Sequence, residues 1–155
     1  MRLSFEFAGD RQVDRRLEGM RLAAVDARPA FDKMGDNLRA AERRQFRSEG
    51  GYGSGGWSPL SPAYRRWKTA HYPGRPILVR SGELLKSLTD RPFGIDEVHP
   101  SFAIFGTNVE YAIYHQLGTE RMPRRPVIDL PESLRRRWVK ILQRWLVEQR
   151  TDPAE

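Results

Sequence analysis

The sequence contains no cysteine, which excludes disulfide bonds and thiolate metal sites. It has no apolar run long enough to span a membrane, and its first ten residues lack the long apolar core of a signal peptide. We therefore expect a soluble, unprocessed protein that works in a cytosolic or other intracellular assembly compartment, without membrane contact.

Histidine is scarce as well, since His71, His99 and His115 are the only three. None has a partner at i+3 or i+4, the spacing that places two metal ligands on one helix face. His115 with Glu110 and Asp129 could supply a base and its orienting carboxylate. A single histidine without a nucleophile is, however, more typical of a half-buried hydrogen-bonding residue. The sequence therefore predicts no catalytic site, no metal and no cofactor.

Acidic residues are fewer than basic ones, which gives a net charge of +7 and a pI near 10.2. This balance is typical of proteins that meet polyanions or acidic protein surfaces. Arginine greatly outnumbers lysine, and arginine also serves protein interfaces through its planar donor fork and its stacking on aromatic rings. The charge alone therefore does not choose between DNA and protein partners.

Regular structure is not expected at residues 49–61, which are rich in glycine, serine and proline and predict a flexible, exposed loop. Gly51, Gly53 and Gly56 have the spacing G-x-G-x-x-G. A dinucleotide-binding turn with this spacing follows a buried strand, whereas a polar helix precedes these glycines. Ser54 likewise lacks the strand and helix that hold a hydrolase nucleophile on a strained turn.

The rest of the chain shows clear hydrophobic periodicity, with alternation typical of strands and a 3.6-residue repeat typical of helices. Strands are expected at 2–8, 93–99 and 101–106. Helices are expected at 11–28 and 29–48, which could also be one kinked helix, and at 62–70, just after Ser81, 108–118 and 131–149. Residues 119–131 predict a proline-stiffened extended arm, and the last six residues should fray.

These elements predict one α+β domain covering residues 1–155. Its core would be a small, mostly antiparallel β-sheet made by the N-terminal strand and the 93–106 hairpin, packed by N-terminal and C-terminal amphipathic helices. The two short helices between residues 62 and 89 suggest a helix-turn-helix, but the connection at 71–80 is too long and contains prolines.

Four segments in order carry a more specific signal, namely WSPLSPAY, ILVRSGELLKSL, FGTNVEYAIYHQLGT and MPRRPVI. Together they resemble the phage virion morphogenesis family, the tail completion or neck proteins of Mu-like phages and prophages. The resemblance covers about residues 46–130. One departure is visible, because relatives often carry Pro-Ala-Arg-Pro followed by an aromatic where this chain has Pro-Arg-Arg-Pro and Val127. The added charge limits how far contacts of the arm can be transferred.

The resemblance implies a non-enzymatic virion protein that completes the tail or neck and joins the tail to the head connector. It also implies a homo-oligomeric ring, with a hexamer as the expected size, that contacts the head connector and tail tube or tail terminator proteins. DNA in the channel could contact it without specificity. The expected location is the virion, in its tail or neck, and the host cytoplasm during assembly.

The residues suit such a role, because interfaces favour aromatic and arginine anchors on stiff segments. The candidate interface residues are Tyr52, Trp57, Arg121, Arg124 and Arg125, and the candidate structural motif comprises Gly106, Tyr111, His115, Gly118, Pro123 and Pro126. We expect Tyr111 and His115 to lie on one helix face that holds the MPRRP arm. The alternative is a basic DNA-binding accessory protein that uses the arginine face of the last helix.

Overall fold

The computed structural model describes residues 15, 17–21, 26–53 and 55–148. The strand predicted at 2–8 and the predicted fraying at 150–155 lie outside these residues. So does most of the helix predicted at 11–28, of which residues 15 and 17–21 are helical.

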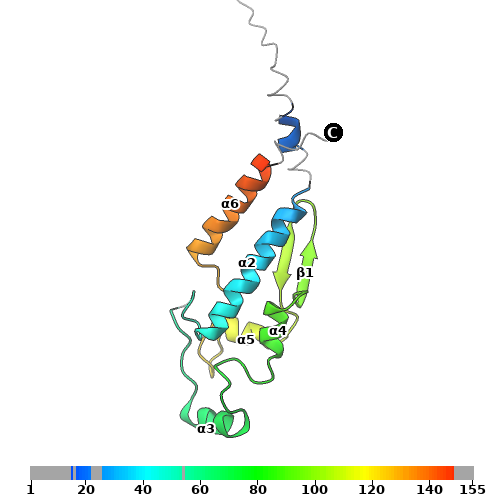
Figure 1. Ribbon diagram of the computed structural model, residues 1–155. Coiled ribbons are helices and arrows are strands. Elements are labelled where there is room, and N and C mark those ends of the chain that lie inside the picture. Colours follow the sequence, from blue (N-terminus) through cyan, green and yellow to red (C-terminus); the bar gives the residue numbers. More distant parts are fainter. Residues whose placement is uncertain (1–14, 16, 22–25, 54, 149–155) are drawn as a thin grey trace, which may run out of the picture.

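Helix α2 (Arg28–Arg47) is the central element of the fold. Pro29 lies in its first turn, where the missing amide hydrogen has no helical acceptor to lose. The helix packs against α6, α4 and both strands, so helices and a hairpin cover it from different sides (Figure 1). The prediction of a helix that begins at Pro29 and ends near residue 48 is confirmed.

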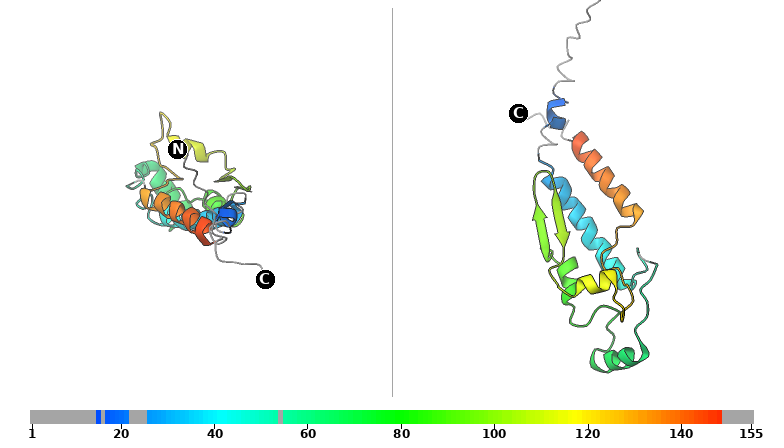
Figure 2. Two further views of the ribbon diagram at one scale, coloured as in Figure 1. Left: turned by 90° about the horizontal axis from the view of Figure 1, so that it is seen from above. Right: turned by 180° about the vertical axis from the view of Figure 1, so that it is seen from behind.

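Strands β1 (Ile95–Val98) and β2 (Ala103–Gly106) form an antiparallel hairpin, in which Ile95 pairs with Gly106 and Val98 with Ala103. The α+β fold class is therefore confirmed, with the hairpin as the sheet of the described residues. In the right-hand view of Figure 2, the hairpin lies along one side of α2 and α6 lies on the other side of that helix.

Helix α3 (Pro62–His71) begins where the sequence predicts, since the Ser61 hydroxyl accepts a hydrogen bond from the Tyr64 amide at 3.3 Å. Helix α4 (Glu83–Thr89) follows only after residues 72–82, and α3 lies at the far end of the molecule from the hairpin (Figure 1). The long connection agrees with the expectation that the two helices form no helix-turn-helix.

Helix α5 (Ala112–Leu117) is shorter than the predicted 108–118. Its start is delayed because the Thr107 hydroxyl accepts from the Val109 amide and bonds to the Ser87 hydroxyl, which fixes a turn there. Helix α6 (Glu132–Glu148) matches the predicted last helix and turns Leu134 and Trp138 toward α2.

The core consists of two apolar clusters that share α2. One, at the α4 and α5 end, contains Phe46, Trp57, Val79, Leu84, Leu88, Val109, Ala112 and Val127. The other, between α2, α6 and the hairpin, contains Leu38, Ala41, Phe93 and Leu134, with Tyr52, Phe105, Leu130 and Trp138 packed around them.

One charged side chain of α2 is buried without a partner. Glu42 is 1% exposed, and neither of its carboxylate oxygens has a hydrogen-bond donor among the described residues. Burial, and then the nearby negative charge of Asp129, raise the pKa of Glu42 well above its ordinary value of 4.5. The carboxyl group is therefore held in its neutral form over a wider pH range than in the unfolded chain.

Candidate functional site

Residues 119–128 of the predicted arm, called the arm from here on, fold back on α5 through one side-chain amide. The Gln116 Oε1 accepts from the amides of Val127 and Ile128 at 2.9 and 3.0 Å, and its Nε2 donates to the Ile128 carbonyl at 3.0 Å. The amide therefore pairs with the arm as a neighbouring strand would, satisfying backbone groups that lie outside any sheet. We call α5, the arm and this pairing the joint.

Arg125 ties the joint to the segment before α3. It is 4% exposed, its amide donates to the His115 carbonyl at 2.8 Å, and its guanidinium donates to the carbonyls of Ser58 (2.7 Å) and Pro59 (3.0 Å). A planar guanidinium can serve two adjacent carbonyls in this way, whereas an ammonium cannot match the geometry. Arg125 thus connects segments 66 or more residues apart in sequence.

Trp57 makes a second connection to the arm. It is 7% exposed, packs edge-on against Phe46 and donates from Nε1 to the Pro126 carbonyl at 2.7 Å. Gln45 also reaches this carbonyl, at 3.3 Å, while its Oε1 accepts from the Gly53 amide at 3.0 Å. Trp57 therefore belongs to the core, and its indole is engaged within the subunit.

The glycine-rich segment at 49–61 is more constrained than its composition suggests. Gly50 has a φ of +87°, and a side chain there would meet the Trp57 ring at 2.5 Å. The Trp57 amide donates to the Glu49 carbonyl at 2.7 Å, which closes the loop at its base. Tyr52 lies half-buried beside Arg44, whose guanidinium is 5.7 Å from the ring centre. The mobility of this segment stays a prediction. Its expected exposure is wrong at Trp57, because that side chain is buried.

Two glycines of the predicted motif differ in what they require. Gly118 ends α5 with a φ of +78°, and a Cβ there would lie 2.9 Å from the Arg124 nitrogen. Gly106 lies at the end of β2, and a Cβ there would meet only the Ile95 side chain, at 3.8 Å. The predicted helix end at Gly118 is confirmed and needs glycine, while space at Gly106 would admit a methyl group.

Tyr111 and His115 contact each other, with ring centres 6.1 Å apart in an edge arrangement. Burial, and then the Arg125 charge, lower the pKa of His115, so its imidazole is neutral at pH 7. The Tyr111 hydroxyl lies 3.5 Å from a Glu83 carboxylate oxygen. The two rings thus share one face of the joint, as expected, but the arm is held mainly by Gln116 and by the His115 backbone.

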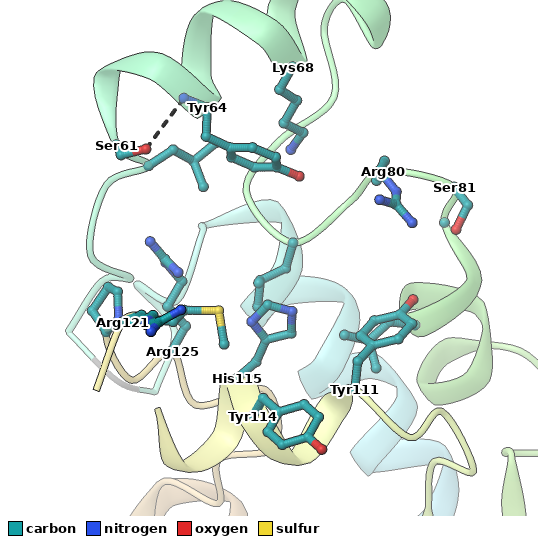
Figure 3. Close-up of a pocket in the computed structure, with 16 residues that line it drawn as sticks. Ser61, Tyr64, Lys68, Arg80, Ser81, Tyr111, Tyr114, His115, Arg121 and Arg125 are labelled. Carbon is teal, nitrogen blue, oxygen red and sulfur yellow. Dashed lines mark hydrogen bonds between the residues drawn. The ribbon is translucent and has the colours of Figure 1, made fainter. Parts of the chain in front are cut away.

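A cleft of about 610 Å³ opens between α3, the connection at 78–82 with the start of α4, α5 and the arm (Figure 3). Its sixteen lining residues include the apolar Leu60, Leu78, Leu84 and Met122 and the tyrosines 64, 111 and 114. Four cations line it and no carboxylate does: Lys68, Arg80, Arg121 and Arg125. We call it the basic cleft.

The sequence-predicted interface residues are divided between the surface and the interior. Arg121 and Arg124 are exposed, and Arg124 donates to the Gln116 carbonyl at 3.1 Å. Trp57 and Arg125 are internal, and their role between subunits stays a prediction. Pro123 lines the basic cleft, and the Pro126 carbonyl accepts the Trp57 bond.

Sequence reasoning did not single out Gln116 as the residue that holds the arm. The sequence offered one signal for Gln116: it follows His115 on α5, and an extended, proline-rich segment comes a few residues later. Among the described residues, no three histidine, aspartate or glutamate side chains gather to hold a metal ion. No helix in the described part of the chain is long and apolar enough to cross a membrane.

Comparison with known proteins matches residues 8–147 to the model of the phage virion morphogenesis family. A relative, "Mu-like prophage FluMu G protein 1" of Haemophilus influenzae, is 29% identical over 107 residues, which cover 68% of this chain and 70% of that protein. No solved structure matches the chain significantly. Since the family model spans nearly the whole described fold, from α2 to α6, the chain belongs to the phage virion morphogenesis family.

Proposed function

We propose that this protein completes the phage tail or neck and joins the tail to the head connector, acting through protein–protein contacts in a ring. Its family supports a role in virion morphogenesis, and its relative is a Mu-like prophage protein. The structural observation that carries the proposal is an exposed apolar face on α5.

That face contains Ile113, Tyr114 and Leu117, which are 51%, 56% and 68% exposed on a helix of six residues. Burying such side chains within the monomer would stabilise its fold by about 25 cal/mol per Å² of apolar surface. The fold instead uses Gln116 and Ala112 of α5 for internal contacts and leaves these three outward. We infer that neighbouring subunits or virion partners cover them in the assembled particle.

In this proposal the chain acts as a structural component and not as an enzyme. Its subunits form a homo-oligomeric ring, with a hexamer as the expected size, between the head connector and the tail tube or tail terminator. It resides in the tail or neck of the virion after assembly in the host cytoplasm, and any contact with DNA in the channel is non-specific.

The alternative of a basic DNA-binding accessory protein rests on the arginine face of α6. Arg136 and Arg144 on that face each lie near a glutamate of the same helix, at 3.0 and 3.8 Å. These surface pairs reduce the positive charge available to phosphates, which is why we favour protein contacts. Duplex affinity that falls steeply between low and moderate salt would favour the alternative.

The proposal is tested by complementing a phage or prophage deleted for this gene. We expect the deletion to give separate heads and tails, full-length protein to restore joined particles, and Leu117→Asp to fail although it folds. Val139→Asp is the matched control, because Val139 is 53% exposed on α6, away from the joint. Joined, infectious particles from the deletion itself, or from both Asp variants alike, would overturn the proposal.

A further inference from the structure

The basic cleft, which α5 and the arm help to line, has features of a binding site. Its volume of about 610 Å³ lies within the roughly 300–1,000 Å³ range of pockets that enclose small ligands or short chain segments. Its floor is apolar, with Leu84 1% exposed and Leu60 and Leu78 half-buried. An apolar anchor on the occupant would therefore be stabilised there.

The four cations of the cleft fall into two classes. Lys68 and Arg125 are buried and donate to carbonyls, Lys68 to Pro76 and Arg125 to Ser58 and Pro59. Arg80 and Arg121 are exposed, and among the described residues no ion pair engages either one. Figure 3 shows them on opposite sides of the opening. An occupant with carboxylates on both sides of its anchor would meet both arginines.

We propose that the basic cleft binds an acidic peptide segment of a different virion protein, with an apolar side chain on the cleft floor and flanking carboxylates on Arg80 and Arg121. Charge complementarity selects this occupant, because sixteen lining residues include no carboxylate that would repel it. The proposal rests on the joining function for the partner being a virion protein.

A second copy of this chain is a poorer occupant. The chain carries a net charge of +7, and its exposed carboxylates at Asp36 and Glu132 already pair with its own arginines. Bringing another copy to the cleft would place positive charge against Arg80 and Arg121. DNA would satisfy the two arginines but has no apolar group as large as a leucine or phenylalanine side chain for the floor formed by the leucines.

The test is fluorescence anisotropy with the full chain and a labelled, capped hexapeptide, Asp-Glu-Leu-Phe-Asp-Glu. A second peptide replaces all four acids with lysine, and a 12-nucleotide single strand serves as competitor. We expect the acidic peptide to bind at least tenfold more tightly than the basic one, and affinity to fall severalfold between 50 and about 200 mM salt because the flanking pairs lie near the surface.

Two matched double variants locate the site. Arg80→Gln with Arg121→Gln should lower affinity about tenfold, as expected for two lost surface-type pairs. Arg135→Gln with Lys140→Gln removes the same charge from α6 and should change affinity less than twofold. The reversal Arg80→Glu with Arg121→Glu should transfer preference to the basic peptide, an effect that a folding defect cannot produce.

Any one of three results would overturn the proposal. Both Gln double variants could lower peptide affinity equally, the reversal variant could still prefer the acidic peptide, or the oligonucleotide could displace the acidic peptide completely. Peptide binding tests the cleft by itself, whereas the deletion phage tests joining. Failure of the peptide to bind, with joining still lost in the deletion, would reject the cleft's role and leave the proposed function standing.

Discussion

The joint with its tryptophan contact and the buried face of α2 differ in how they accommodate a polar group. Gln116 and Trp57 bond to backbone groups of the arm, and Arg125 of the arm bonds to the backbone carbonyl of Ser58. On α2, Glu42 is 1% exposed and has no donor among the described residues. Buried polar groups stabilise a fold only when they are paired, so the first arrangement adds stability and specificity while the second lowers stability.

The largest expected effect comes from Gln116→Ala. It removes three hydrogen bonds and leaves two amides and a carbonyl of the arm unpaired, so the free energy of unfolding should fall by about 3 kcal/mol. Urea unfolding followed by circular dichroism measures this. Gln143→Ala, at an exposed position of α6, is the control and should stay within about 0.5 kcal/mol. Similar small losses in both variants would show that the joint does not depend on its amide.

Gly118→Ala should cost about 2 kcal/mol, because alanine is strained at a φ of +78° and its methyl would press on the Arg124 backbone. Gly106→Ala is the matched control within the same motif and should stay within about 0.5 kcal/mol of the parent. Thermal unfolding compares the two. An equal cost at both positions would contradict the distinction drawn between them.

Trp57→Phe should lower the free energy of unfolding by about 1.5 kcal/mol, since it leaves a gap beside Phe46 and removes the stronger donor to the Pro126 carbonyl. Trp67→Phe, at a ring that is 41% exposed, should change it by less than about 0.5 kcal/mol. Chemical denaturation followed by circular dichroism compares the two variants. The reverse order would place Trp57 outside the core.

Glu42→Gln has the smallest expected effect and the opposite sign. A raised folded-state pKa means that wild-type stability is full below about pH 4.5, the unfolded value, and decreases as pH rises through the folded pKa. Glutamine cannot ionise, so the variant should be about 1 kcal/mol more stable than wild type at pH 7 and lose that part of the pH dependence.

The control for that prediction is Glu97→Gln, at an exposed position of β1, which should change the free energy of unfolding at pH 7 by less than about 0.5 kcal/mol. Denaturant midpoints measured from pH 4 to pH 8 give both profiles. Destabilisation by Glu42→Gln at pH 7 would mean that the carboxylate has a favourable partner, and the contrast between the two regions would disappear.

Sequence patterns predicted the helix starts and ends that depend on residues close together in the chain. The Ser61 cap, the Pro29 helix start and the Gly118 helix end were all readable, because each depends on neighbours within four residues. The start of α5 was predicted four residues early, since Thr107 is fixed by Ser87 from another element.

The contents of the site were harder to predict, because they depend on partners distant in the chain. The local signal at Gln116 is only its place after His115 on α5, and the two amides that donate to its Oε1 lie 11 and 12 residues away. Trp57 in a glycine-rich segment looked like a surface anchor, yet its acceptor lies 69 residues further along. The basic cleft joins α3 to α5 and the arm, so no single segment could reveal it.

The bonds from Trp57 to Pro126 and from Arg125 to Ser58 also bear on the order of folding. They close chain segments of 69 and 67 residues, and the entropic cost of closure rises with loop length. The hairpin and α4 form from contacts between near neighbours, and proteins rich in such contacts fold faster than those that rely on distant ones. We therefore expect the arm to dock late in folding, so a newly made chain would pass through a state with most of its secondary structure formed and its arm still undocked.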